Sequence, residues 1–189
     1  MSIYVIIIIA SLILSAFFSG MEIAYVSANK IHIEIEKKQE GILAKILSRL
    51  TAKPSKFITT MLIGNNIALV IYGFFMGDLL VSWFQSMLPT TSSFVDYLLT
   101  DLSLLSQTII STFVILITAE FLPKVFFQIY SNTLIKILAL PAYIFYVLFT
   151  FISDFVIWIS DFVLKYVFKT EGDQIQLAFT KVELGNYIS

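Results

Sequence analysis

Apolar residues gather in long runs along the chain, separated by one charged stretch and one short polar loop. The runs at residues 3–26, 57–85 and 102–122 are each long enough to cross a bilayer as a helix, because about 20 apolar residues suffice. Residues 27–56 are rich in charge, yet their apolar positions recur at helical spacing, which predicts amphipathic helices broken near Gly41. The pattern predicts an all-α membrane protein with three transmembrane helices and amphipathic juxtamembrane helices.

Residues 125–168 are apolar but contain scattered polar side chains, so their length permits two arrangements. Asp154 and Asp161 are seven positions apart and share one helical face, as in a helix that lies at the membrane surface. A fourth crossing would also carry the two lysines that come after it to the outer side, against the charge rule for membrane loops. We therefore expect juxtamembrane belt helices over 125–168, with a fourth crossing over 137–160 as the alternative.

Composition supports the membrane assignment and removes several classes of function. Of the 189 residues, 58% are hydrophobic and 13% charged, with a mean hydropathy of +0.90, whereas soluble domains carry about 25% charged residues. A net charge of −1 offers no basic surface for nucleic acid. The chain holds no Cys and one His, His32, which excludes disulfides, Cys/His zinc sites and Ser-His-Asp catalysis. No nucleophile–base pair or cofactor motif is present, so we do not expect an enzyme.

Basic residues predict the orientation, because positively charged loops stay in the cytoplasm. Seven of the 12 Lys and Arg residues fall within 27–56, whereas the loop at 86–101 has none and carries Asp96 and Asp101. We therefore expect the N-terminus outside, the charged segment inside and the C-terminus in the cytoplasm.

Polar side chains at membrane depth are costly, so each is a candidate for function. In the first run, Ser15, Ser19 and Glu22 lie on one stripe of the helix; hydroxyls at this spacing also allow two helices simply to pack closely. In the second run, Gly64 and Asn65 place a flexible backbone beside an amide oxygen, which is a hard ligand. A lone amide can also serve as a bond between helices.

The third run ends on a proline that frees a backbone oxygen. Pro123 cannot donate a hydrogen bond to the carbonyl of Ala119, so that oxygen is available to another partner. Glu120 comes directly after Ala119; the alternative for this carboxylate is an ordinary helical ion pair with Lys124, four residues on.

These polar groups can converge in the inner half of the bilayer, because the first and third spans run in the same direction and the second runs opposite. A site built from them offers hydroxyl, amide, carbonyl and carboxylate oxygens, without sulfur or imidazole. Hard cations prefer this set, Mg²⁺ above all if the cage is tight, with Na⁺ and Ca²⁺ as open alternatives.

Three ordered motifs match a known family. Residues 17–24 (FFSGMEIA), 62–66 (LIGNN) and 120–124 (EFLPK) resemble the membrane domain of the CorC/CNNM family of magnesium transporters, a resemblance that covers residues 1–170. It implies three spans, a belt-like helix at the inner face, a homodimer, and Mg²⁺ export coupled to inward movement of Na⁺. We expect a multi-pass protein of the bacterial inner membrane.

The resemblance also implies further domains after the membrane domain. In the family a pair of cytosolic CBS modules comes next, and nucleotide binding is expected only there. Residues 171–189 are then expected to be the linker to these modules.

The resemblance assigns the metal ligands residue by residue. They are Ser15, Ser19, Gly64, Asn65 and Glu120. Separately from the resemblance, we expect Glu22 to draw cations to the entrance. The chain departs from the family pattern at Ala119, where Gly is usual, and at Leu69, where Asn is common. The first departure restricts how the third helix opens its backbone, and the second removes a potential ligand.

A second class of function fits the same residues. A non-transporting membrane scaffold, or a Mg²⁺ sensor that dimerises cytosolic domains, would use the spans to hold a dimer. Ion flux separates the two hypotheses, because a sensor binds Mg²⁺ without moving it.

Overall fold

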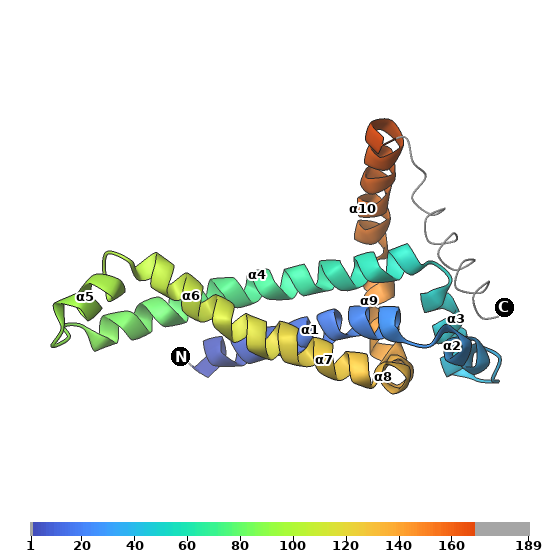
Figure 1. Cartoon of the computed structure of the whole chain (residues 1–189), viewed down its shortest axis with the longest axis horizontal. Helices are drawn as coiled ribbons and strands as arrows, with labels where there is room; N and C mark the ends of the chain where they lie inside the picture. The colour runs from blue at the N-terminus through green and yellow to red at the C-terminus, as the bar shows by residue number, and fades with distance from the viewer. Residues whose placement is uncertain (1, 169–189) are drawn as a thin grey trace, which may run out of the picture.

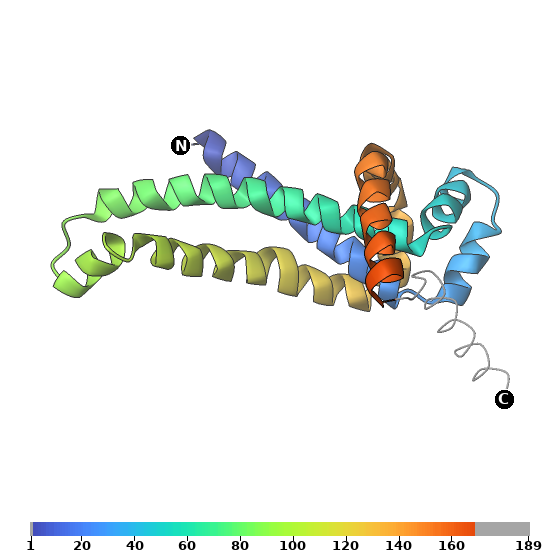
Figure 2. The same cartoon turned by 90° about the horizontal axis from the view of Figure 1, so that it is seen from above.

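Three long helices form the body of the protein. The computed structural model describes residues 2–168, and every regular element within them is a helix. The first two are α1 (Ser2–Ser27) and α4 (Pro54–Met87), and the third joins α6 (Ser103–Ile115), η1 (Leu116–Phe121) and α7 (Leu122–Ile129). They lie side by side along the long axis of the molecule (Figures 1 and 2). All three are long and apolar enough to cross a bilayer, which confirms the predicted fold class.

The third span continues through Pro123 to Ile129, whereas the apolar run predicts an end at residue 122. A proline in a helix lacks its N–H, and its ring crowds the carbonyl four residues back. The six residues of η1 before it wind as a π-helix, in which the N–H of Leu122 bonds to the carbonyl of Ile117, five residues back. This wider turn accommodates the proline without ending the helix.

The charged segment folds as two short helices at one end of the bundle, α2 (Lys30–Lys37) and α3 (Ile42–Thr51). The Asn29 side chain caps α2 by accepting hydrogen bonds from two backbone N–H groups. Gly41 separates the helices with a φ of 140°, a conformation that favours glycine. The apolar face of α3 is buried, as its amphipathic pattern requires.

The chain then turns across the same end of the bundle. After α8 (Ser131–Ile137), the helices α9 (Ala139–Leu148) and α10 (Thr150–Val163) run crosswise to the three long helices (Figures 1 and 2). Together α8 and α9 are apolar enough for a broken span, but they bend by 62°. A final π-helical turn, η2 (Leu164–Phe168), ends the described part; the expected linker at 171–189 lies outside it.

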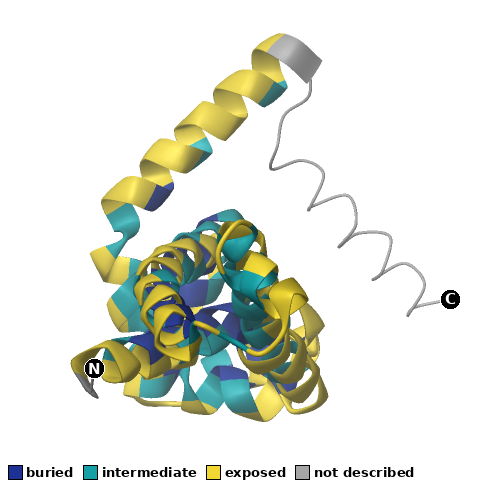
Figure 3. Cartoon of the chain, turned by 90° about the vertical axis from the view of Figure 1, so that its left-hand side faces the viewer, coloured by how far each residue is buried: buried dark blue, intermediate teal, exposed yellow. Residues whose placement is uncertain are grey.

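Two apolar clusters hold the bundle together, one toward each end of α4. Figure 3 shows buried residues gathered inside the bundle, while α10 projects from it almost fully exposed. The cluster near the crosswise helices is built around Phe18, Met21, Phe57, Met61 and Ala142. The other is built around Ile8, Tyr72, Met76, Leu80 and Phe84.

Polar contacts attach α10 to the bundle. The Lys56 ammonium, which is buried, lies 2.7 and 2.8 Å from the two carboxylate oxygens of Asp154. One turn further along α4, the hydroxyl of Thr60 bonds to that of Ser153 at 2.9 Å, and both side chains are fully buried. Ser153 is the buried residue of α10. These two polar contacts therefore attach the crosswise helix to α4.

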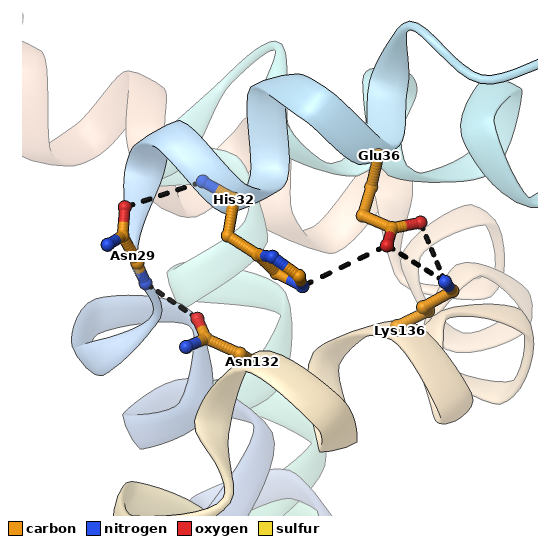
Figure 4. A network of polar contacts seen from close by, with 5 residues as sticks. All are labelled: Asn29, His32, Glu36, Asn132 and Lys136. Carbon is orange, nitrogen blue, oxygen red and sulfur yellow. Dashed lines mark hydrogen bonds and ion pairs between the residues drawn. The ribbon is translucent and has the colours of Figure 1, made fainter.

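A second polar network fastens α2 to α8 (Figure 4). Lys136 donates to Glu36 at 2.8 Å, and His32 Nε2 lies 3.9 Å from the same carboxylate. Next to it, the backbone N–H of Asn29 donates to the side-chain oxygen of Asn132 at 2.8 Å. Because Glu36 is buried, these partners replace the water that it would otherwise bind.

The attachment of α10 can be tested with a matched pair of variants. Asp154→Asn leaves the buried Lys56 ammonium without its counter-charge, and we expect it to lower the free energy of unfolding by about 2 kcal/mol. Asp161→Asn, an exposed aspartate on the same helix, should change it by less than about 0.5 kcal/mol. Thermal unfolding in detergent measures both; equal losses would contradict the attachment described above.

Candidate functional site

The first contact of the site joins α1 to α4. The Ser15 hydroxyl donates to the side-chain oxygen of Asn65 at 2.6 Å. Ser15 is fully buried and Asn65 partly so, whereas the neighbouring Asn66 is exposed. Of the two neighbouring amide side chains in this helix, Asn65 contacts the serine stripe of α1, and Asn66 is exposed.

The second contact joins α1 to the π-helix of the third span. One turn after Ser15, the Ser19 hydroxyl donates to the backbone carbonyl of Ala119 at 2.9 Å. Both residues are buried. In a regular α-helix the donor to this carbonyl would sit at position 123, where proline has no N–H. In the structure the carbonyl accepts the Ser19 hydroxyl, as a prediction of an available oxygen at Ala119 allows.

Gly64 contributes close packing beside the site. A Cβ at this position would lie 2.5 Å from the Phe18 ring, so glycine is what lets α1 and α4 approach here. Gly20 has the same relation to Phe127 of α7. At both glycines, an aromatic ring of a neighbouring helix occupies the space that a Cβ would need. The two glycines thus allow close packing of the helices near Ser19.

Glu120 lies next to this pair of contacts, on η1. Its side chain is 29% exposed, and the Lys124 ammonium lies 3.7 Å from its carboxylate. The helical ion pair that we considered as the alternative for Glu120 is therefore present. Glu22 of α1 is partly buried, and Lys124 also interacts with it electrostatically.

The donor set suits a hard cation. The contacts bring together the hydroxyls of Ser15 and Ser19, the amide oxygen of Asn65 and the carbonyl of Ala119. Glu120 follows Ala119 in the chain, and its side chain forms the ion pair with Lys124. A hydroxyl that donates its proton keeps lone pairs for a ligand, and amide and carbonyl oxygens have two. Within residues 2–168 no three His, Cys, Asp or Glu side chains cluster, so mostly neutral oxygens would bind a cation here.

Comparison with known proteins identifies the family of the chain. A family model described as the Cyclin M transmembrane N-terminal domain, CNNM, matches residues 6–189. The chain belongs to the CNNM family. It is therefore a membrane protein of the CorC/CNNM type, in a family of membrane domains and not of enzymes.

One curated relative shares part of this CNNM domain. The UPF0053 inner membrane protein YfjD of Escherichia coli (strain K12) is 32% identical over 119 residues, which are 63% of the chain. The match spans 24% of the length of that relative.

The two departures from the family pattern have different consequences in this CNNM domain. Ala119 is fully buried, yet its carbonyl is still reached by Ser19, so the added methyl group does not close off this oxygen. Leu69 is partly buried and has no side-chain oxygen, so it offers the site no ligand.

Sequence reasoning missed the partners that cross between helices. It placed Ser15 and Ser19 on one stripe but paired neither, and it did not connect Lys56 with Asp154. The one available signal was a lysine at the very start of the second apolar run, where an ammonium needs a partner.

The packing role of Gly64 can be tested against a second glycine of α4. Gly64→Ala drives a methyl group into the Phe18 ring, and we expect a loss of about 2 kcal/mol in unfolding free energy. Gly73→Ala meets nothing within 4 Å, so it should be neutral or stabilise by less than about 1 kcal/mol. Thermal unfolding in detergent measures the stability of both variants. Adding Phe18→Leu to Gly64→Ala should restore part of the lost stability, because the smaller side chain makes room for the methyl group. A Gly64→Ala variant as stable as Gly73→Ala would refute the close approach.

Proposed function

We propose that this CNNM domain is the membrane part of a transporter that exports Mg²⁺ coupled to inward movement of Na⁺. The cation binds among α1, α4 and η1, at Ser15, Ser19, Asn65, the Ala119 carbonyl and Glu120, next to Gly64. The observation that carries the proposal is the pair of contacts from Ser15 and Ser19 to two different helices, beside the one carboxylate of η1.

Mg²⁺ is the cation that this set favours. It prefers oxygen ligands in a compact octahedral arrangement and dehydrates reluctantly, so a negative charge must help to offset the loss of water. Glu120 supplies that charge at the site, and Glu22 attracts cations toward it. The pairs Ser15–Asn65 and Ser19–Ala119 each join two helices. Binding or release of the ion between them therefore changes how the helices pack.

The arrangement of the helices supports an orientation. With the basic segment 27–56 in the cytoplasm, α9 and α10 lie crosswise along the inner face of the bacterial plasma membrane, as belt helices. The exposed aromatic residues of α10 then face lipid, among them Phe155, Trp158 and Phe162. The N-terminus is outside, the protein is a homodimer, and cytosolic CBS modules come after the membrane domain.

A Mg²⁺ sensor or scaffold without transport is the second candidate. The Glu120–Lys124 ion pair favours it, because a carboxylate that already has a counter-charge attracts a cation less strongly. Flux of Mg²⁺ into or out of reconstituted liposomes separates the two functions.

Single substitutions test the ion site. We expect Ser19→Ala and Asn65→Ala each to weaken Mg²⁺ binding by at least about tenfold, since each removes a ligand oxygen. Asn66→Ala is the matched control, because its amide is exposed one residue away. Isothermal titration with Mg²⁺ measures the affinities, and equal behaviour of Asn65→Ala and Asn66→Ala would argue for packing alone.

Glu120→Gln tests transport itself. It keeps the shape of the side chain and removes its charge, so we expect Mg²⁺ flux in liposomes to be abolished while thermal stability is kept. Unchanged flux would refute the role of Glu120.

The orientation can be tested because the chain has no cysteine. Lys38→Cys and Ser92→Cys place single thiols at exposed positions in the charged segment and in the loop after α4. A membrane-impermeant maleimide added to intact cells should label the Ser92→Cys variant and spare the Lys38→Cys variant. Labelling of Lys38→Cys but not of Ser92→Cys would show the opposite orientation in the membrane.

A further inference from the structure

The ion pair of Lys124 with Glu120 is longer than the ion pairs that Lys56 and Lys136 form. The Lys124 ammonium lies 3.7 Å from the Glu120 carboxylate, beyond hydrogen-bonding distance, and its side chain is 41% exposed. By contrast, Lys56 and Lys136 hold their carboxylates at 2.7 and 2.8 Å. The Lys124 pair is a loose one, so the ammonium can leave the carboxylate for water at little cost.

The Lys124 ammonium interacts electrostatically with two carboxylates, and the closer one is that of Glu120. Besides Glu120 on its own helix, Lys124 interacts electrostatically with Glu22 of α1. A lysine side chain is a compact charge on a flexible four-carbon stem, so the ammonium can move toward the Glu120 carboxylate or away from it into water. The positive charge of Lys124 therefore already offsets part of the negative charge that would attract a cation to Glu120.

We propose that Lys124 is a tethered competitor that determines which cations reach Glu120. This inference rests on the proposed function. The ammonium neutralises the carboxylate until an incoming ion displaces it toward water. A divalent ion gains about twice the Coulomb energy of a monovalent one at the same distance, so it displaces the ammonium where Na⁺ or K⁺ does not.

The competition predicts two effects of one substitution. Lys124→Gln removes the competitor and should tighten Mg²⁺ binding by roughly fivefold, the size of a partly exposed ion pair. It should also lower selectivity, so that added K⁺ reduces Mg²⁺ binding more strongly in Lys124→Gln than in the native chain. Lys53→Gln removes an exposed charge before α4 and is the control for net charge; it should leave both quantities unchanged.

A chemical version of the experiment isolates the ammonium. Since the chain has no cysteine, Lys124→Cys introduces a single thiol that methanethiosulfonate reagents modify. Attachment of an aminoethyl group restores an ammonium and should return the Mg²⁺ affinity and selectivity to native values. Attachment of a methyl group should leave the tighter, less selective binding. If Lys124→Gln does not fold, Lys124→Met provides the same comparison with a side chain of similar length.

The experiment distinguishes failure of the Lys124 competition from failure of the proposed Mg²⁺ site at Glu120. Mg²⁺ titration of the native chain and of Glu120→Gln comes first; no binding, or binding insensitive to Glu120, overturns both. If native binding depends on Glu120 but Lys124→Gln binds Mg²⁺ equally or more weakly, only the competition is overturned. Equal affinities after aminoethyl and methyl modification would overturn it too.

Discussion

A polar atom at membrane depth has no water to bind, so it must find its partner within the protein. This constraint explains the contacts that organise the three long helices. Ser15 donates to the Asn65 side-chain oxygen of α4, and Ser19 donates to the backbone carbonyl of Ala119 in η1. The groups that satisfy one another across the helices are also the oxygens that a hard cation would use. Helix packing and the proposed ion binding would therefore use the same atoms.

The crosswise helices obey the same constraint at the end of the bundle. Lys56 is buried near the start of α4, and Asp154 of α10 supplies its counter-charge. Glu36 of α2 is likewise buried and receives Lys136 of α8. These charged contacts attach α10 to α4 and α2 to α8, so the crosswise end of the bundle is connected to the long helices that carry the candidate site.

Much of this architecture was readable from the sequence, and the remainder depends on tertiary structure. Hydropathy predicted three spans because lipid selects long apolar runs, and the proline rule predicted the free carbonyl of Ala119. The continuation of the third helix to Ile129 was not predictable, since a π-helical turn before Pro123 has no signature in residue type. Nor could the pattern show that Gly64 packs on Phe18, because helix spacing alone does not give the rotation of each helix.

The central claim is that one cation binds where α1, α4 and η1 meet. A density map of the protein in a bilayer mimic, collected with Mg²⁺ and again after chelation, tests it most directly. A bound ion should give a peak, present only with Mg²⁺, at about 2.1 Å from oxygens of Ser15, Ser19, Asn65 and Ala119 or Glu120. Unchanged serine contacts in both maps, with no peak among these helices, would contradict it.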